Sequence, residues 1–228
     1  MNGLLPEPRG PNAPGSAGDE VLMLDTAHCT IIAVDIAGFG QRDPSNANQV
    51  RMRHGMYKAI HTAFDAAGIP WSSCRDEDRG DGMLILAAAD VRKRPFADLL
   101  PNVLAGELAA HNRLHRPRER IRLRLALHAG EVNFDLHGVT GSSINHTCRL
   151  LDSDAVKDAL GKSPAVLAII SSAWFFEDVI RRNELSRPQA YRRVDVVNKE
   201  TRTEAWIRLV RPSAARRPQA SPRSEQSA

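Results

Sequence analysis

The chain has 228 residues, of which 42% are apolar and 25% charged, and its formal net charge is +4. This length is enough to bury one core, and no apolar run approaches the ~18 residues that a membrane-spanning helix needs. The N-terminus has no basic stretch followed by an apolar one, which argues against a secretory signal. The three cysteines, Cys29, Cys74 and Cys148, show neither metal-cluster nor disulfide spacing, so we expect a reduced, cytoplasmic setting.

Both ends of the chain are rich in Pro, Gly, Ala and Ser and lack apolar periodicity. Such segments cannot offset the entropy of ordering, so we predict disordered tails over residues 1–25 and 211–228, around one folded domain at 26–210. The second tail is basic, a composition that also occurs in chains that touch nucleic acid or lipid. A solubilising tail is the commoner case, and we expect neither a nucleic-acid nor a membrane partner.

The first elements are a buried strand and a helix. Residues 29–36 form a nearly continuous β-branched and apolar run, which is typical of a central strand, and 37–40 form a glycine-rich turn. Asp43 followed by Pro44 predicts a helix N-terminus, and Gly68 predicts its end.

A hairpin and a second helix follow. Residues 71–78 and 83–87 read as two strands, and the turn residues at 79–82 join them. The spacing of apolar residues over 95–114 then predicts an amphipathic helix.

Residues 120–128 alternate between polar and apolar side chains, which predicts a strand with its arginines on a solvated face. Ala129 and Gly130 predict a turn, after which 132–136 continue the alternation as a second strand. A short helix is expected over 142–151.

The remaining segments complete an α+β domain. Residues 166–170 predict a buried strand, a helix capped by Ser171 or Ser172 follows, and 191–197 with 204–209 predict a final strand pair. This order favours a ferredoxin-like, mixed or antiparallel sheet with helices packed on one face.

Two acidic residues are the strongest chemical signal. Asp35 ends the first strand and Asp81 lies at the hairpin tip, so adjacent pairing of these elements would bring the carboxylates together. Mg²⁺ commonly takes one or two carboxylates plus substrate phosphates. The loop 36–40 leads toward a helix N-terminus, where backbone N–H groups can hold phosphate oxygens. Asn145 and Arg149 share one helix face and could position a ribose and stabilise charge on a phosphate.

Four segments in order and spacing resemble the class III nucleotidyl cyclase homology domain, and the resemblance covers roughly residues 28–210. It implies a two-metal site for Mg²⁺ or Mn²⁺, in-line attack of the 3′-hydroxyl on the α-phosphorus and release of pyrophosphate. It also implies a homodimer in which metal carboxylates of one protomer face Asn and Arg of the other. The four segments are 30–39, 77–82, 122–130 and 141–149.

The resemblance assigns roles residue by residue. Asn145 and Arg149 match the residues that orient the ribose and stabilise the transition state. We also expect Asp35→Asn to abolish turnover without disturbing the fold, because the residue ends a strand. The candidate metal-binding positions are Asp35, Ile36 and Asp81, and the candidate substrate-binding positions are Phe39, Gly40, Glu77, Gly138 and Lys199.

The base-recognition positions depart from the adenylyl pattern. Glu77 replaces a lysine and is similar to guanylyl cyclases, whereas Gly138 offers no side chain. A pocket with neither purine signature also resembles the pyrimidine cyclases of bacterial anti-phage signalling, which make cyclic UMP or cyclic CMP for a separate effector. We rank the pyrimidine product first, followed by cyclic GMP and cyclic AMP.

The alternatives to an enzyme are a catalytically silent, dimeric nucleotide-binding module and, less favoured, a nucleic-acid-binding protein.

Overall fold

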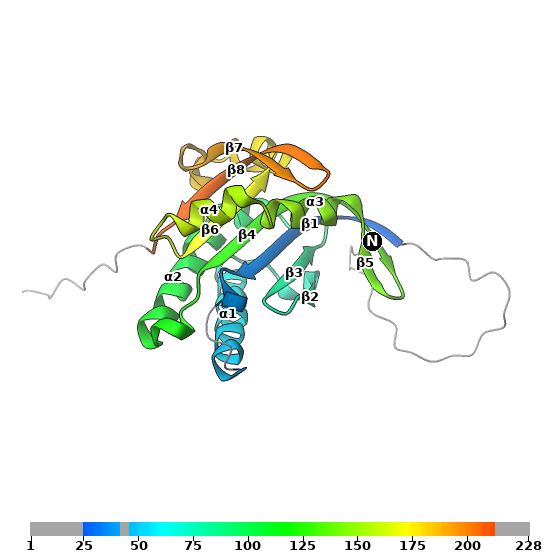
Figure 1. Ribbon diagram of the computed structural model, residues 1–228. Coiled ribbons are helices and arrows are strands. Elements are labelled where there is room, and N and C mark those ends of the chain that lie inside the picture. Colours follow the sequence, from blue (N-terminus) through cyan, green and yellow to red (C-terminus); the bar gives the residue numbers. More distant parts are fainter. Residues whose placement is uncertain (1–24, 42–45, 213–228) are drawn as a thin grey trace, which may run out of the picture.

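The computed structural model describes residues 25–41 and 46–212. Eight strands form one sheet in the order β2-β3-β1-β4-β6-β8-β7, with β5 paired to β4 (Figure 1). Among these pairings β4–β6 is parallel and the others are antiparallel, so the predicted mixed sheet is confirmed. The strands are β1 (Asp25–Ile36), β2 (Cys74–Asp78), β3 (Gly82–Ala87), β4 (Leu123–Asp135), β5 (Gly138–Thr140), β6 (Leu167–Ser172), β7 (Arg192–Asn198) and β8 (Thr201–Val210).

Helices cover both faces of the sheet (Figure 1). The apolar side chains of α1 and α2 form a core on one face, and those of α3 and α4 form a second core on the other. The expected packing on a single face is therefore wrong, since element order alone does not show to which side each connection returns. The helices are α1 (Asn46–Ala66), α2 (Leu99–Leu114), α3 (Ser142–Leu151), α4 (Asp154–Gly161) and α5 (Ala173–Phe175), which continues as a π-helix over Phe176–Ile180.

Strand β1 is buried on both faces. Ile32, Val34 and Ile36 enter the core below α1 and α2. Ile31 and Ala33 enter the core below α3 and α4. A strand covered on both sides has apolar residues at successive positions, which explains why the sequence shows a continuous apolar run here.

Strand β4 runs without interruption through the predicted turn at Ala129 and Gly130. The glycine serves close packing instead of chain reversal. A Cβ atom at Gly130 would lie 2.3 Å from the Oγ of Ser143, so only glycine lets α3 approach the strand this closely. The chain reverses later, where the carboxylate of Asp135 accepts hydrogen bonds from the amides of His137 and Gly138.

Other boundaries differ from prediction by a few residues. Helix α2 begins at Leu99, capped by the Asp98 carboxylate, because residues 94–96 form a separate 3₁₀ turn. Strand β2 begins at Cys74, because residues 71–73 also form a 3₁₀ turn. Further 3₁₀ turns span Phe39–Gln41, Pro117–Glu119, Glu184–Ser186 and Pro188–Ala190.

Arg122, just before β4, and Arg124, within it, do not lie on a solvated face as predicted, whereas Arg120 is exposed. Arg122 is half-buried and donates hydrogen bonds to the carbonyl oxygens of Leu160, Ser163 and Ala165. These bonds tie the end of α4, and the segment that follows it, to the sheet.

Several predictions fall where the structure gives no description. The helix cap at Asp43 and Pro44 lies outside the described residues. So do the predicted tails, apart from residues 211–212 and Asp25, which is the first residue of β1. Within the described residues, no helix is both long and apolar enough to span a membrane.

Candidate active site

The end of β1 and the tip of the β2–β3 hairpin meet. Asp35 pairs with Gly82 across the two strands, and the amide of Ile36 donates to the carbonyl oxygen of Asp81 at 2.9 Å. A Cβ atom at Gly82 would lie 2.0 Å from the carbonyl oxygen of Val34, so this position requires glycine. The backbone therefore fixes the hairpin tip, and with it Asp81, beside the strand end that bears Asp35.

The carboxylate of Asp35 is held by a guanidinium. Arg124 lies opposite it on β4 and donates from Nε and Nη2 to the two carboxylate oxygens at 2.7 and 2.6 Å. The two side chains are only 12% and 14% exposed. Burial raises the pKa of Asp35, the bonds from Arg124 oppose this, and the charges of Asp81 and Asp152 raise it further. The strand pairing and the Ile36–Asp81 backbone bond place Asp81 beside Asp35, in keeping with this effect of its charge.

Asp35 and Asp81 fit a site for Mg²⁺ or Mn²⁺. Magnesium binds proteins through one or two carboxylates and completes its shell with water and substrate phosphates. In the described part of the chain, no three His, Cys, Asp or Glu side chains gather as a metal cluster, so this pair would hold a cation together with substrate. Both oxygens of Asp35 contact Arg124, so a cation would have to share that carboxylate or displace the guanidinium.

The turn after β1 is only partly described. Phe39 and Gly40 lie in a 3₁₀ turn, with Phe39 against the core and Gly40 exposed. Helix α1 begins at Asn46, and the residues between lie outside the description. The helix N-terminus expected to hold phosphate oxygens, at Asp43 and Pro44, lies outside the described residues.

Glu77 and Gly138 come together in one chain. Gly138 has a φ of 143°, and a Cβ atom there would lie 3.4 Å from Oε1 of Glu77. Arg79 donates to the Glu77 carboxylate at 2.8 Å, and Arg75 lies 3.5 Å from it. The predicted base-recognition positions thus share one small site, in which guanidinium groups balance the carboxylate.

Asn145 and Arg149 both lie on α3, and Asn145 is exposed. Nη2 of Arg149 donates to Glu200 at 3.2 Å, and Nδ2 of Asn198 donates to the carbonyl oxygen of Arg149 at 2.9 Å. Lys199 lies between Asn198 and Glu200 in the turn that joins β7 and β8. The structure therefore brings Lys199 next to the residues that hold Arg149.

Electrostatic contacts connect these groups. The positive charge of Arg79 acts on Cys148 of α3, where it opposes the rise in pKa that burial causes. The negative charge of Asp152, which follows α3, has the opposite effect on Asp35, whose pKa it raises. Cys148 and Asp152, at the C-terminal end of α3, therefore lie near the hairpin and the end of β1.

Sequence reasoning missed three residues of this region. The alternation over 120–128 predicts a solvated face for Arg124, and no sequence pattern points to Arg79 or Glu200 as site residues. A signal existed for Arg124, because it lies opposite Asp35 once β1 and β4 are paired antiparallel.

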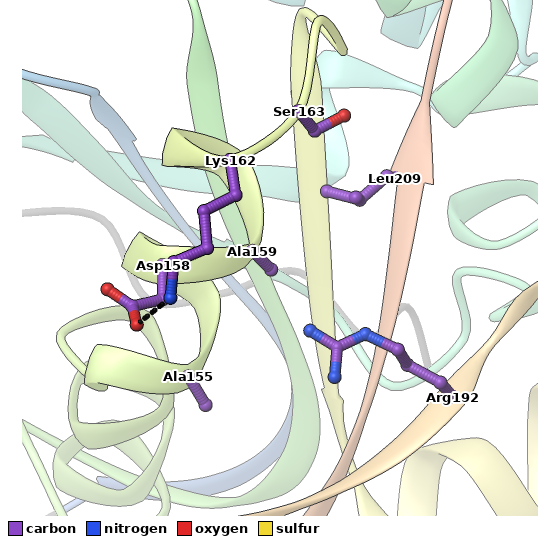
Figure 2. Close-up of a pocket in the computed structure, with 7 residues that line it drawn as sticks. All are labelled: Ala155, Asp158, Ala159, Lys162, Ser163, Arg192 and Leu209. Atoms are coloured by element: carbon purple, nitrogen blue, oxygen red, sulfur yellow. Dashed lines mark hydrogen bonds and ion pairs between the residues drawn. The ribbon is translucent and has the colours of Figure 1, made fainter.

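The pocket in Figure 2 lies elsewhere, between α4 and strands β7 and β8. It has a volume of about 470 Å³, and Lys162 on its rim pairs with Asp158 while Arg192 points across it. It contains none of the candidate site residues.

No protein-family model matches the sequence, and no curated protein matches it. Solved structures do. The guanylyl cyclase Cya2 is 16% identical with a TM-score of 0.56, and the match covers 84% of this chain and 95% of that one. The adenylate/guanylate cyclase/hydrolase from Silicibacter pomeroyi is 17% identical, with 82% and 99% covered and a TM-score of 0.55. The guanylate cyclase domain of RhGC from Catenaria anguillulae, in complex with GTP, is 15% identical, with 83% and 100% covered and a TM-score of 0.52.

These matches establish an architecture. The protein has the α+β fold of class III adenylyl and guanylyl cyclase domains. The resemblance that four short sequence segments indicated is confirmed at the level of the fold.

Proposed function

We propose that this protein is a nucleotidyl cyclase, which converts a nucleoside triphosphate into a 3′,5′-cyclic nucleotide and pyrophosphate. The observation that carries the proposal is the fixed proximity of Asp35 and Asp81 at one end of the sheet of a cyclase fold. Asn145 and Arg149 on α3 supply the second half of the chemistry.

Each of these residues has a role that follows from its chemistry. A divalent cation bound by the two aspartates would favour the ionised 3′-hydroxyl and offset charge on the triphosphate. The exposed amide of Asn145 can hydrogen-bond the ribose. The guanidinium of Arg149 can donate to oxygens of the phosphate that is attacked, and Lys199 can contact the terminal phosphates.

We propose further that the active site is shared between two copies of the chain. Within one chain, Asp35 is paired with Arg124, whereas Arg149 is paired with Glu200 on the β7–β8 turn. Asp35 and Arg149 therefore have different partners in a single protomer. A symmetric dimer would place the acidic pair of one copy opposite α3 of the other and form two equivalent sites.

The base is the finer part of the proposal. The carboxylate of Glu77 can accept a hydrogen bond from a base N–H group, and Gly138 presents no side chain to read a purine. We therefore rank cyclic UMP or cyclic CMP first, as messengers for a separate effector, followed by cyclic GMP and cyclic AMP.

The direct test incubates the purified chain with ATP, GTP, CTP and UTP in Mn²⁺ buffer and analyses the products by mass spectrometry. A 3′,5′-cyclic nucleotide from at least one substrate is the expected result. Binding without turnover by a dimer would instead favour a silent nucleotide-binding module, and would refute the enzyme.

Mixing two inactive variants tests the shared site. Asp81→Asn removes a metal ligand and Arg149→Gln removes the guanidinium, so each homodimer lacks one component in both of its sites. Random exchange of subunits gives heterodimers with one intact site, and a 1:1 mixture should recover about a quarter of the wild-type activity. A mixture as inactive as its components would rule out a site built from two chains.

A further inference from the structure

The β7–β8 turn contacts Arg149 at two points. Asn198 donates to its carbonyl oxygen at 2.9 Å, and its guanidinium donates to Glu200 at 3.2 Å. Lys199, between them, has a φ of 52°, in a left-handed conformation that non-glycine residues adopt infrequently. The turn is thus shaped around the residue to which we assign transition-state stabilisation.

The guanidinium of Arg149 is incompletely bonded in this arrangement. Its Nε is buried and, among the described residues, has no hydrogen-bond partner. A guanidinium binds carboxylates and phosphates best when two of its N–H groups donate in parallel. The single, long bond to Glu200 leaves this second interaction unmade, and a buried donor without an acceptor is unfavourable.

Glu200 is a weakly held acceptor. Its side chain is 72% exposed, whereas that of Arg149 is 24% exposed. A hydrogen bond from its own backbone amide and the bond from Arg149 lower the pKa of Glu200, so this carboxylate is ionised at neutral pH. The negative charge of Glu200 therefore lies against the guanidinium of Arg149, which the proposed reaction needs for binding a phosphate group.

We propose that Glu200 takes the place of a substrate phosphate on Arg149 in the nucleotide-free protein, and that it thereby weakens nucleotide binding. This inference rests on the proposed function, because it assigns the phosphate to the same guanidinium. The exposed glutamate must leave Arg149 before phosphate oxygens can accept hydrogen bonds from the guanidinium, so the two anions compete for one site.

The test measures nucleotide affinity without turnover. The probes are the four 3′-deoxynucleoside triphosphates, which lack the attacking hydroxyl, titrated calorimetrically in Mn²⁺ buffer. We expect Glu200→Gln to lower the Kd of each nucleotide that binds by about two- to fivefold, the range expected for an exposed ion pair. Glu204→Gln is the matched control, because it removes the same charge from the same hairpin but contacts Arg193.

A double-mutant cycle separates competition from general electrostatics. In an Arg149→Gln background, Glu200→Gln should leave the Kd unchanged, because the contested group is gone. An equal or higher Kd in Glu200→Gln than in wild type would overturn this inference and leave the proposed function standing. Equal tightening by Glu204→Gln, or tightening that persists without Arg149, would also overturn it. Failure of the wild-type chain to bind any probe would overturn both proposals.

Discussion

Replacing Asp35 by Asn is expected to cost stability as well as activity. The expectation from sequence that this change leaves the fold undisturbed is wrong in its premise, because Asp35 is one half of a buried ion pair. The substitution removes the negative charge and leaves Arg124 uncompensated. Asn retains one oxygen that can accept a single hydrogen bond, so part of the interaction survives.

The structure sets the size of the effect. Both side chains are less than 15% exposed, and two bonds of 2.7 and 2.6 Å join them. Removing one partner of a buried pair typically costs 3–5 kcal/mol, and we take about 3 kcal/mol here because some solvent contact remains. For a domain of this size that corresponds to a fall in Tm of about 6–12 °C.

The measurement is urea denaturation followed by circular dichroism, with Asp81→Asn as the control. Asp81 lies in a part-exposed turn, and we expect its neutralisation to change the unfolding free energy by less than about 1 kcal/mol. Asp35→Asn combined with Arg124→Met removes both charges and should restore most of the loss, because apolar replacement of a buried pair is often neutral. Wild-type stability in Asp35→Asn alone, or strictly additive losses in the double variant, would refute this reasoning.

Three further outcomes are expected. Gly130→Ala should destabilise the fold by about 1–3 kcal/mol in thermal denaturation, because its Cβ would lie 2.3 Å from Oγ of Ser143, and Ser143→Ala should recover part of the loss. Burial, with a smaller contribution from His146, lowers the pKa of His128 from 6.5 to about 4. The folded state thus prefers neutral His128, and this contribution to stability is complete above pH 6.5 and is lost as the pH falls through about 4. In that window the free energy of unfolding of His128→Gln should depend on pH less steeply than that of wild type, by up to about 1.4 kcal/mol per pH unit. Equal slopes would contradict the assignment. Glu77→Gln should lower kcat/KM for the preferred nucleotide by about tenfold relative to the others, measured in the four-nucleotide assay, and an unchanged ranking would remove Glu77 from base recognition.

The meeting of Asp35 and Asp81 could be predicted because it depends on local features. A continuous apolar strand followed by a glycine-rich hairpin leaves few ways to pair, and adjacent pairing places both residues at one end. Gly130 shows the limit of such reasoning. Glycine occurs both at turns and where another element packs closely, and only the position of Ser143 on α3 decides between the two.

Without the strand pairing, the polar partners could not be predicted, for a related reason. Arg124 bonds to a residue 89 positions away, and Arg149 to one 51 positions away. Contacts between residues this far apart in the sequence leave no periodic pattern in it. An arginine that alternates with apolar residues looks the same in the sequence whether its face meets water or a carboxylate. Pairing register, once the strand order is known, is what separates the two cases.

The central place of β1 has a consequence for motion. The strand is hydrogen-bonded to neighbours along both edges, and helices cover both of its faces, so its amides should be among the slowest in the molecule to exchange with deuterated solvent. Asp35 belongs to that strand, whereas Glu200 lies in an exposed surface turn. The strand that bears Asp35 would then open only when the whole domain unfolds, whereas the turn that bears Glu200 would fluctuate many times between such unfolding events.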